Sequence, residues 1–389
     1  MNEGIRCSII RGGTSKGLYL LEEDLPPAGP ARDHVLLNLM GSPDKKQING
    51  LGGGTSVTSK VAILAPSKHP FADVDYTFAQ VSVDKPIVSY KGNCGNILAG
   101  VGPFVLESGL VPIQGDVTRV RIFNTNTNSV INETVVTRNG KVCYSGNYQI
   151  AGVPGMASPI VIETEKPHGT ISEQLLPTGH AVDELDVPGI GKLKVSIVDV
   201  TNPLLFVRAS ELGLTGTELP ARIDSDQELL DKLERIRGVA AQYLGLLDDY
   251  RNSSTVSPTI PKLTLVAAPE TYQNVNGHEI KDTDVDLVGR MMSMQKAHPT
   301  YAMTGALCTV AAAAIPGTVV NQVMRPEAKM DQFRIGHPGG VIEVGAETTF
   351  NDGKVEIQKV FGYRTARMLM TGVAFFENSA CETETARRK

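Results

Sequence analysis

Short apolar runs closed by turn residues dominate the first part of the chain. Residues 5–25 read IRCSIIRGGTSKGLYLLEEDL, with two β-rich runs on either side of a glycine-rich turn. This pattern predicts a strand, a turn and a second strand. Residues 59–66, SKVAILAP, form another β-rich run that ends at a proline, and they predict a third strand.

Helical spacing is clearest at residues 225–247. Five apolar residues repeat there on one face of a helix, namely Leu229, Leu230, Leu233, Ile236 and Val239. Apolar residues three and four positions apart predict an amphipathic helix packed against a core. We expect Ser225 and Glu228 to form its capping box, because a Ser followed three residues later by Glu satisfies two free backbone N–H groups.

Three blocks of the first half recur in the second half in the same order. Residues 193–212 (LKVSIVDVTNPLLFVRASEL) resemble 5–25, residues 262–269 (KLTLVAAP) resemble 59–66, and residues from Ala302 (AMTGALCTVAA) resemble those from Gly92 (GNCGNILAGVG). A shared order predicts an internal duplication. We therefore expect an α+β protein of two homologous domains, 1–187 and 188–389, whose last strand is free to return to the first domain.

The proposed domain boundary lies in the Pro/Gly-rich stretch 187–191, and 153–155 is the competing position. Within each domain, the apolar runs ILAGVG and AAAA have almost no polar face and must be buried. We expect each run to form a central helix wrapped by a curled, mostly antiparallel, barrel-like sheet.

Composition narrows the class of protein. The formal net charge is −5, and basic and acidic residues are interleaved, so no nucleic-acid surface is expected. No apolar run approaches the roughly 20 residues that span a bilayer, and the N-terminus lacks a signal-peptide pattern. We expect a cytoplasmic protein whose partner is a small molecule, with the oligomeric state left open, a homo-oligomer included.

The five cysteines are widely spaced and include no CxxC pair, which argues against disulfides and a zinc site. Cys94 differs from the others because it lies in GNCGN, directly before a predicted helix, where backbone N–H groups favour an anion. We interpret Cys94 as a reactive residue and Cys7, Cys143, Cys308 and Cys381 as structural ones. Asn93, Gly95 and Asn96 are candidates for substrate binding.

Lys60 follows the glycine-rich loop GLGGGTSVTS and begins an apolar strand. Burial there disfavours its charged form, so Lys60 is a candidate general base. A solvated lysine at the start of a strand is the alternative. Consecutive glycines are typical of backbone close to a ligand, and we expect substrate contacts from Gly53, Gly54, Thr55 and Ser59.

The turn RGGTSKG offers Ser15 and Lys16 as further substrate ligands. Residues 13–17 also match GxSxG, the pattern of a serine hydrolase, but the following LYLL predicts a strand where that enzyme class needs a helix. The seven histidines form no HxH or HxxxH pair, so no metal or other cofactor is expected. His337, in IGHPGG, is the one histidine that we place at the site.

Together, RGGTSKG, GGGTSVTSK, GNCGNILAGVGPF, TGALCTVAAAAIPGTVVNQV and IGHPGG resemble the PrpF family over nearly the whole chain. The family includes 2-methylaconitate cis-trans isomerase, aconitate Δ-isomerase, 3-methylitaconate Δ-isomerase and 4-oxalomesaconate tautomerase. The resemblance implies a diaminopimelate epimerase-like fold of two like domains with one active site between them. It also implies Lys60 and Cys94 as the acid/base pair.

In the epimerase each domain supplies a catalytic cysteine, whereas here the second position is Thr304, which argues against a two-cysteine mechanism. Met303, Thr304 and Gly305 are the expected substrate contacts of the second domain. The amino-acid sequence around Thr304 resembles the methylaconitate, aconitate and methylitaconate isomerases of the family more than the tautomerases. A serine hydrolase using Ser15 and a non-catalytic accessory protein of a methylcitrate dehydratase are the alternatives from other classes.

Overall fold

The computed structural model describes residues 2–90, 93–167, 169, 171–172, 174–258, 260–293, 295–351 and 354–377. The chain divides into two compact units. Unit 1 comprises Met1–Gln149, Val153–Ile162 and Arg364–Lys389, and unit 2 comprises Ile150–Gly152 and Glu163–Tyr363. This division differs from the expected boundary at 187/188. Cys381 and the basic tail lie outside the described residues.

The stretch 187–191 forms a hairpin turn inside unit 2. Val187 pairs with Gly191 across the hairpin, and the Ile190 N–H donates to the Val187 carbonyl at 2.9 Å. Gly189 has a φ of +74°, which a tight turn requires and which glycine adopts without strain. Prolines and glycines serve linkers and tight turns alike, so composition did not distinguish the two.

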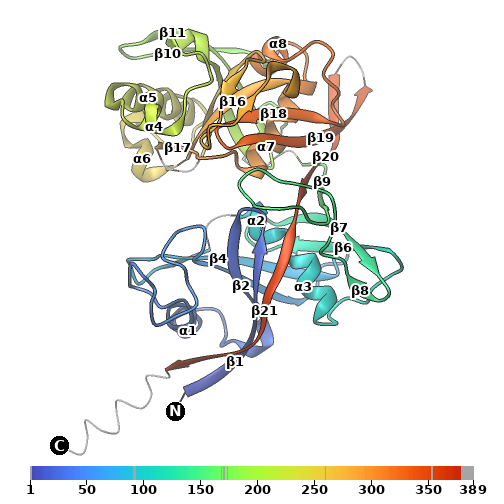
Figure 1. The fold of residues 1–389 in the computed structure, drawn as a ribbon. Helices are drawn as coiled ribbons and strands as arrows, with labels where there is room; N and C mark the ends of the chain where they lie inside the picture. Colours follow the sequence, from blue (N-terminus) through green and yellow to red (C-terminus); the bar gives the residue numbers. More distant parts are fainter. Residues whose placement is uncertain are drawn as a thin grey trace, which may run out of the picture. The chain divides into compact units, whose positions relative to one another are not determined.

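Unit 1 is built on a mixed, mostly antiparallel sheet (Figure 1). Antiparallel pairs join β1 to β2, β1 to β21, β3 to β4 and β6 to β7, while β2 with β3 and β4 with β6 are parallel. Its strands are β1 (Asn2–Gly12), β2 (Ser15–Leu21), β3 (Lys60–Pro66), β4 (Val74–Val81), β5 (Val88–Ser89), β6 (Val117–Asn124), β7 (Ser129–Arg138), β8 (Lys141–Val142) and β21 (Ala366–Glu377). Its helices are α1 (Pro30–Met40), α2 (Gly95–Leu98), α3 (Val101–Glu107) and a 3-10 turn, Glu22–Asp24.

The two faces of this sheet pack against different helices. Ala62 and Leu64 belong to the core around α2 and α3, while Val61 and Ile63 belong to the core that contains α1 residues. Alternate residues of a strand point to opposite faces, which explains the division. The expected central helix is therefore present in unit 1, as α2 followed by α3.

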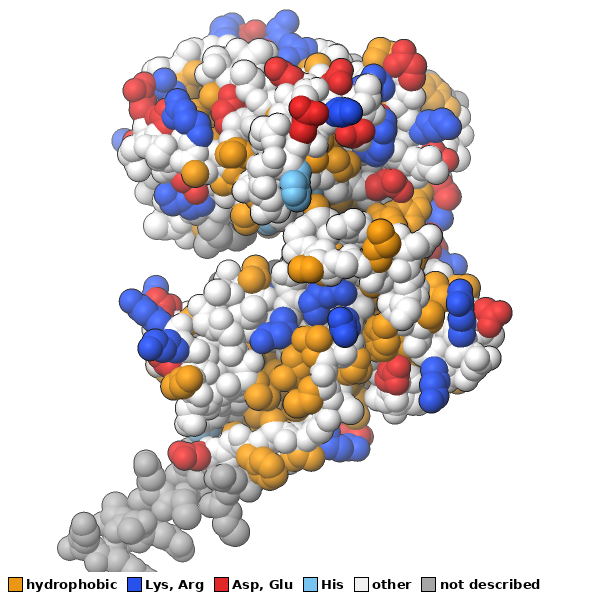
Figure 2. Space-filling model, in the orientation of Figure 1, with side chains coloured by type: hydrophobic (Ala, Val, Ile, Leu, Met, Phe, Trp, Pro, Cys, Tyr) orange, Lys and Arg blue, Asp and Glu red, His pale blue; other side chains and the backbone are white. Residues whose placement is uncertain are grey.

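Strand β21 brings the C-terminal segment back to unit 1, where it pairs with β1 from Asn2 to Gly12. Ala374 and Phe376 are buried against the α1 side of the sheet, whereas Val373 and Phe375 are 52% and 68% exposed. Figure 2 shows exposed hydrophobic side chains gathered over the part of unit 1 where β21 runs. The strand thus closes the core with one face and leaves the other in solvent.

Unit 2 repeats the same arrangement of strands. Its strands are β10 (Asp183–Val187), β11 (Gly191–Val200), β12 (Asn202–Arg208), β13 (Lys262–Ala267), β14 (Tyr272–Gln273), β15 (Glu279–Ile280), β16 (Leu287–Ser293), β17 (Lys296–Ala297), β18 (Phe333–His337), β19 (Gly340–Asn351) and β20 (Lys354–Arg364). The first residues of strand β9 (Ile160–Glu165) belong to unit 1 and its last residues to unit 2. Its helices are α4 (Pro220–Asp224), α5 (Gln227–Tyr243), α6 (Ser253–Val256), α7 (Met303–Ala314) and α8 (Val319–Val323), with 3-10 turns at Ala209–Leu212, Tyr250–Asn252 and Asp282–Asp284.

The succession of strand pairings is the same in both units. In unit 1, β1, β2, β3, β4, β6 and β7 pair successively as antiparallel, parallel, antiparallel, parallel and antiparallel. In unit 2, β11, β12, β13, β16, β18 and β19 follow the same succession. A shared order of this length supports the duplication inferred from the sequence.

Helix α7 is the buried central helix of unit 2. All of its residues except Thr304 and Ala314 are buried, and they pack in one core with residues of β11, β12, β16, β18 and β19. Small side chains let the strands approach closely: a Cβ on Gly305 would lie 1.9 Å from Met291 Cε. The first three alanines of the AAAA run are therefore buried, as expected, and Ala314 is half-buried at the end of the helix.

Helix α5 confirms the predicted amphipathic helix but not its cap. Asp226, rather than Ser225, is the N-cap residue, and its carboxylate accepts a hydrogen bond from the Leu229 N–H at 3.0 Å. The Ser225 hydroxyl instead donates to the Arg222 carbonyl. Asp and Ser have similar capping preferences, so two adjacent candidates could not be separated by pattern alone.

We expect Asp226→Ala to lower the free energy of unfolding by about 1 kcal/mol, because a backbone N–H of the first turn loses its acceptor. Ser225→Ala should change it by less than about 0.5 kcal/mol, since Ser225 does not cap the helix. Urea unfolding followed by circular dichroism measures both variants. A larger loss for Ser225→Ala than for Asp226→Ala would contradict the assignment.

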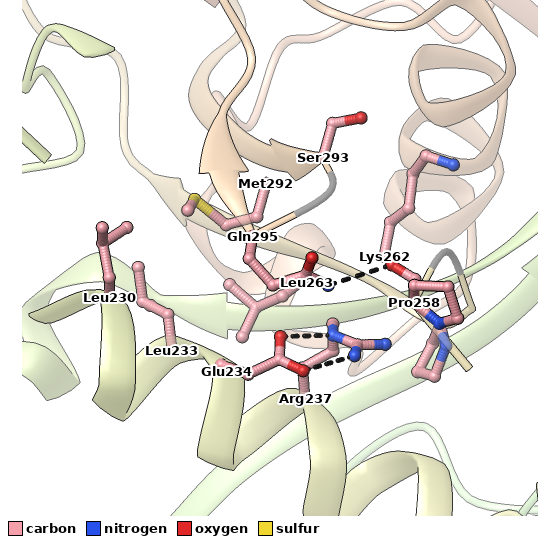
Figure 3. Close-up of a pocket in the computed structure, with 11 residues that line it drawn as sticks. Leu230, Leu233, Glu234, Arg237, Pro258, Lys262, Leu263, Met292, Ser293 and Gln295 are labelled. Carbon is pink, nitrogen blue, oxygen red and sulfur yellow. Dashed lines mark hydrogen bonds and ion pairs between the residues drawn. The ribbon is translucent and has the colours of Figure 1, made fainter. Parts of the chain in front are cut away.

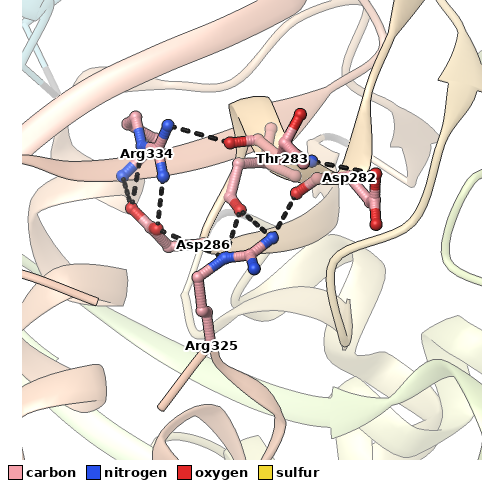
Figure 4. A network of polar contacts seen from close by, with 6 residues as sticks. Asp282, Thr283, Asp286, Arg325 and Arg334 are labelled. Atoms are coloured by element: carbon pink, nitrogen blue, oxygen red, sulfur yellow. Dashed lines mark hydrogen bonds and ion pairs between the residues drawn. The ribbon is translucent and has the colours of Figure 1, made fainter. Parts of the chain in front are cut away.

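A buried carboxylate fixes the start of β18 in unit 2 (Figure 4). Asp286 has a side chain that is 3% exposed, and it accepts from Arg334 Nη2 at 2.8 Å and from the Arg334 backbone N–H at 2.8 Å. Arg325 lies on the other side, with Nε 3.9 Å from Asp286 Oδ1. Multiple donors compensate the desolvation of a buried charge, so Asp286 ties the segment after α8 to β18.

Candidate active site

The turn between β1 and β2 is held by Asn96, at the start of α2. Asn96 Nδ2 donates to Thr14 Oγ1 at 3.0 Å, and Asn96 Oδ1 accepts from the Thr14 N–H and from Arg364 Nε, each at 3.3 Å. A Cβ on Gly13 would lie 2.1 Å from Asn96 Oδ1, and its φ is +50°. Only glycine fits there, which explains the Gly-Gly of RGGTSKG. The Asn96 amide, expected to bind substrate, is engaged in this contact.

Cys94 immediately precedes α2 and is partly buried against the core of unit 1. It lies close enough to Tyr19, Tyr76 and Arg364 to influence the pKa of each. Next to it, Asn93 is partly buried, and its Oδ1 has no hydrogen-bond partner within the part of the chain that the structure describes. Gly92, the first residue of the GNCGN motif, lies outside that part.

Lys60 is the first residue of β3 and is 9% exposed, so the expected burial is confirmed. Its Nζ donates to Gln80 Oε1 at 2.6 Å and lies 5.1 Å from the centre of the Phe78 ring. Gln80 in turn donates from Nε2 to the Ser59 carbonyl at 2.8 Å. The amine is thus held by a neutral acceptor and an aromatic face, without a carboxylate among these contacts.

The start of β3 and the first turn of α2 meet at Gly17 of β2. A Cβ on Gly17 would lie 2.7 Å from the Lys60 carbonyl oxygen and 2.9 Å from Ile97 Cδ1. Lys60 shares its strand face with Ala62, which packs in the same core as Ile97 and Cys94. Lys60 and Cys94 therefore lie at the same end of unit 1, on the side of the sheet that covers the central helix.

Gln47 organises the glycine-rich loop before Lys60. Its Oε1 accepts from the Gly54 N–H at 2.9 Å, and its Nε2 donates to Ser59 Oγ at 2.7 Å. Ser59 is fully buried, so its hydroxyl supports the loop in this conformation. Thr55 is exposed, and its Oγ1 lies 2.7 Å from Thr58 Oγ1.

The same loop contacts the β1–β2 turn, because the Lys16 N–H donates to the Val57 carbonyl at 3.0 Å. Gly53 packs close to Thr58: a Cβ on Gly53 would lie 2.6 Å from Thr58 Oγ1. The Lys16 side chain is partly exposed. Ser15 is 3% exposed and begins β2, so no helix follows it and the geometry of a serine hydrolase elbow is absent.

A buried carboxyl group, that of Glu133, lies beside the first turn of α3. Glu133 of β7 is fully buried, and its Oε2 accepts from the Gly102 N–H at 2.6 Å. Burial raises the pKa of Glu133 to about 8. Tyr19 and Tyr76 are also fully buried, and burial, followed by neighbours that include Glu133 and Cys94, raises the pKa of both phenols.

The second group of expected site residues lies in unit 2, in the first turn of α7 and at the end of β18. Met303 is 5% exposed and Thr304 is partly exposed, with its carbonyl accepting from Thr201 Oγ1 at 2.8 Å. His337 is 3% exposed, and its Nδ1 accepts from the Gly339 N–H at 3.1 Å. An accepting Nδ1 leaves the ring proton on Nε2. Gly305 is buried.

The residues that orient the motif residues were not predictable from motifs. Gln80 positions Lys60, Gln47 positions the glycine-rich loop, and Arg364, buried beside Asn96, has its pKa lowered to about 10 by burial. None of them belongs to a recognisable motif. The only signal was a polar residue on an otherwise apolar face of a strand: Gln80 follows Val74, Tyr76 and Phe78 on the same face of VDYTFAQV.

Two classes of site find no support in the described ranges. These residues contain no group of three or more His, Cys, Asp or Glu side chains placed to hold a metal ion. No helix there has the length and apolar character needed to cross a membrane.

The fold is similar to that of solved epimerases. The structure of a hydroxyproline epimerase from Agrobacterium vitis matches with a TM-score of 0.54 at 12% identity, covering 97% of this chain and 94% of that one. A crystal structure of methylitaconate-delta-isomerase matches with a TM-score of 0.87 at 45% identity, covering 97% of this chain and 96% of that one. The diaminopimelate epimerase-like fold expected from the sequence is therefore confirmed.

Residues 2–377 match the family described as PrpF protein, and the chain belongs to the PrpF family. The 3-methylitaconate isomerase of Eubacterium barkeri is 46% identical over 376 residues, which cover 96% of this chain and 98% of that protein. The 2-methyl-aconitate isomerase of Shewanella oneidensis is 40% identical over 381 residues, covering 95% and 96%. Both relatives are named isomerases, which confirms the predicted class of enzyme.

Proposed function

We propose that this protein isomerises the C=C double bond of a small unsaturated polycarboxylate, with Lys60 and Cys94 as the acid/base pair. The relatives named for methylitaconate and methyl-aconitate support this substrate class. The observation that carries the assignment of residues is the Gly17 contact, which joins the start of β3 to the first turn of α2. An amine and a thiol thereby lie at one end of unit 1.

Lys60 in its neutral form is the proposed base. It removes a proton from the carbon next to the double bond, and the electron pair delocalises over the alkene and a carboxylate as a dienolate. The Gln80 oxygen accepts one N–H of Lys60 and fixes the direction of the amine. Positioning of this kind converts binding energy into a lower barrier for proton transfer.

The second step returns one proton to carbon, so the reaction is balanced without an external reactant. If the protonated Lys60 or the Cys94 thiol delivers the proton to the far end of the dienolate, the double bond migrates. When Cys94 is the donor, its thiolate then regains a proton from the Lys60 ammonium, which restores the pair. If the dienolate rotates and the proton returns to its original carbon, the product is the cis–trans isomer. Ser15, Asn93 and the Gly95 amide are the proposed ligands of the carboxylate and enolate oxygens in unit 1.

Of the remaining residues, we assign Lys16, Gly53, Gly54, Thr55 and Asn96 to shaping the unit 1 site. The buried hydroxyl of Ser59 has a supporting role through Gln47. From unit 2 we propose Met303, Thr304, Gly305 and His337 as substrate contacts.

The test is proton NMR in deuterated water with 2-methylaconitate, 3-methylitaconate, trans-aconitate and 4-oxalomesaconate. We expect turnover of at least one acid with deuterium entering the product. Cys94→Ala should lower kcat by about 10²-fold or more, the size of effect typical for a lost general acid. Cys143→Ala, a cysteine at a hairpin elsewhere in unit 1, is the matched control and should keep wild-type activity. Wild-type kcat in Cys94→Ala would rule out its role.

A further inference from the structure

The strand registers of the two units can be matched residue by residue. In unit 1, Ser8 of β1 lies opposite Tyr19 of β2. In unit 2, Ser196 of β11 lies opposite Phe206 of β12. Because the sequences around Ser8 and Ser196 are alike and both pairs are antiparallel hairpins, Tyr19 and Phe206 occupy equivalent positions.

This match extends to the third strand and places a lysine at the same position in both units. Two residues before Tyr19, Gly17 lies beside Lys60 in the parallel β2–β3 pair. Two residues before Phe206, Leu204 lies beside Lys262 in the parallel β12–β13 pair. The sequence blocks had aligned Ser59, one residue earlier, with Lys262. The structural register corrects that alignment, so Lys262 is the counterpart of Lys60.

The surroundings of Lys262 also resemble those of Lys60. Lys60 lies at the end of its sheet where α2 begins, as the contacts of Gly17 show. Leu204, the neighbour of Lys262, lies near the start of α7, since a Cβ on Gly305 would be 3.7 Å from Leu204 Cδ2. Each lysine therefore begins the third strand of its unit beside the first turn of the central helix.

One difference between the two positions bears on their roles. Lys60 has Gln80 as its partner on the adjacent strand. By the β13–β16 register, in which Thr264 lies opposite Met291, the counterpart of Gln80 is Ser293. Ser293 is too short to serve as the same acceptor, and no contact of the described residues hydrogen-bonds or ion-pairs the Lys262 ammonium group.

Lys262 and Ser293 are seen together at the edge of a small hollow between α5, β13 and β16 (Figure 3). The Lys262 ammonium points away from Arg237, whose guanidinium is paired with Glu234 at 2.5 Å. Arg237 therefore has its own carboxylate, and Glu234 is committed to it. The Lys262 ammonium and the Ser293 hydroxyl are left available to a ligand.

We propose that Lys262 and Ser293 form a carboxylate-binding position in unit 2, which takes a carboxylate group of the unsaturated polycarboxylate. The inference rests on the proposed function, and it assigns Lys262 to binding rather than to proton transfer. A lysine ammonium with a neighbouring hydroxyl is a donor set that suits a carboxylate. Burial, followed by the charge of Arg237, lowers the pKa of Lys262, and an anionic ligand offsets both effects.

The experiment compares Lys262→Met with Lys296→Met, an exposed lysine on neighbouring β17. We expect Lys262→Met to raise KM about 10-fold or more while kcat changes less than about 3-fold, because a lost charge-assisted contact weakens binding. Ser293→Ala should raise KM about 3-fold. Lys262→Arg, which keeps the charge, should restore most of the affinity, and Lys296→Met should behave as wild type.

Calorimetric binding of tricarballylate, a saturated tricarboxylate, separates this inference from the proposed function. The probe cannot isomerise, so binding to wild type and weaker binding to Lys262→Met support the site even if no candidate acid turns over. Wild-type KM and tricarballylate affinity in a folded Lys262→Met variant would overturn it. A drop in kcat equal to that of Lys60→Ala would also overturn it, since that result assigns Lys262 to the chemical step.

Discussion

Lys60→Ala is expected to lower kcat by about 10³-fold, within the range found when a positioned general base is removed. The two side chains that contact the Lys60 amine, Gln80 and Phe78, cannot accept a proton from carbon in its place. The loss should appear in both isomerisation and exchange of solvent deuterium into the substrate. NMR in deuterated water measures the two rates in one sample.

Two controls make the Lys60 result specific. Lys46→Ala removes an exposed lysine from the segment before the glycine-rich loop and should leave kcat unchanged. Gln80→Leu keeps the amine but removes its oxygen partner, and we expect a smaller loss, about 10-fold, because the base is then less well directed. If Lys60→Ala retained more than about a tenth of wild-type kcat, another group would have to be the base.

The fold was predictable from the sequence wherever a pattern is local. The hairpin at residues 5–25 and the helix near residue 229 follow from spacing within one segment. The pairing of β1 with β21 joins the two ends of the chain, and no local pattern specifies such a partner. For that reason the return of the last strand to the first domain was predicted only as an option. The boundaries of the two units could not be predicted from the sequence.

The candidate site also contains residues that a local pattern marks and residues that no local pattern marks. Lys60 and Cys94 stand next to glycine-rich motifs, which marked them in the sequence. Gln80, Tyr76 and Glu133 come from strands β4 and β7, where a polar residue within a strand looks like any solvent-facing position. Glu133 in SVINETVVTR gave no sign of burial, because alternation in β7 is compatible with either face being inside. Only the packing of α3 against β7 shows that this carboxyl is inside.

Glu133→Gln is expected to stabilise the protein at pH 8. The pKa of Glu133 is raised from 4.5 to about 8 by burial, while the unfolded chain keeps the ordinary value. Between these two values the unfolded state has lost the proton that the folded state still holds. Stability of the wild type therefore falls as the pH rises from about 5 to 8, by on the order of 4 kcal/mol.

A glutamine at position 133 removes this dependence because it has no proton to lose. Its carbonyl oxygen can still accept from the Gly102 N–H. Urea unfolding at pH 5, 6.5 and 8 should show similar stabilities at pH 5 and a growing advantage for the variant above it. Glu107→Gln, at an exposed position of α3, is the matched control and should follow the wild type. Equal pH dependence in wild type and Glu133→Gln would show that the carboxyl is ionised in the folded protein. In that case a negative charge, rather than a neutral acid, would lie beside α3 in the core of unit 1.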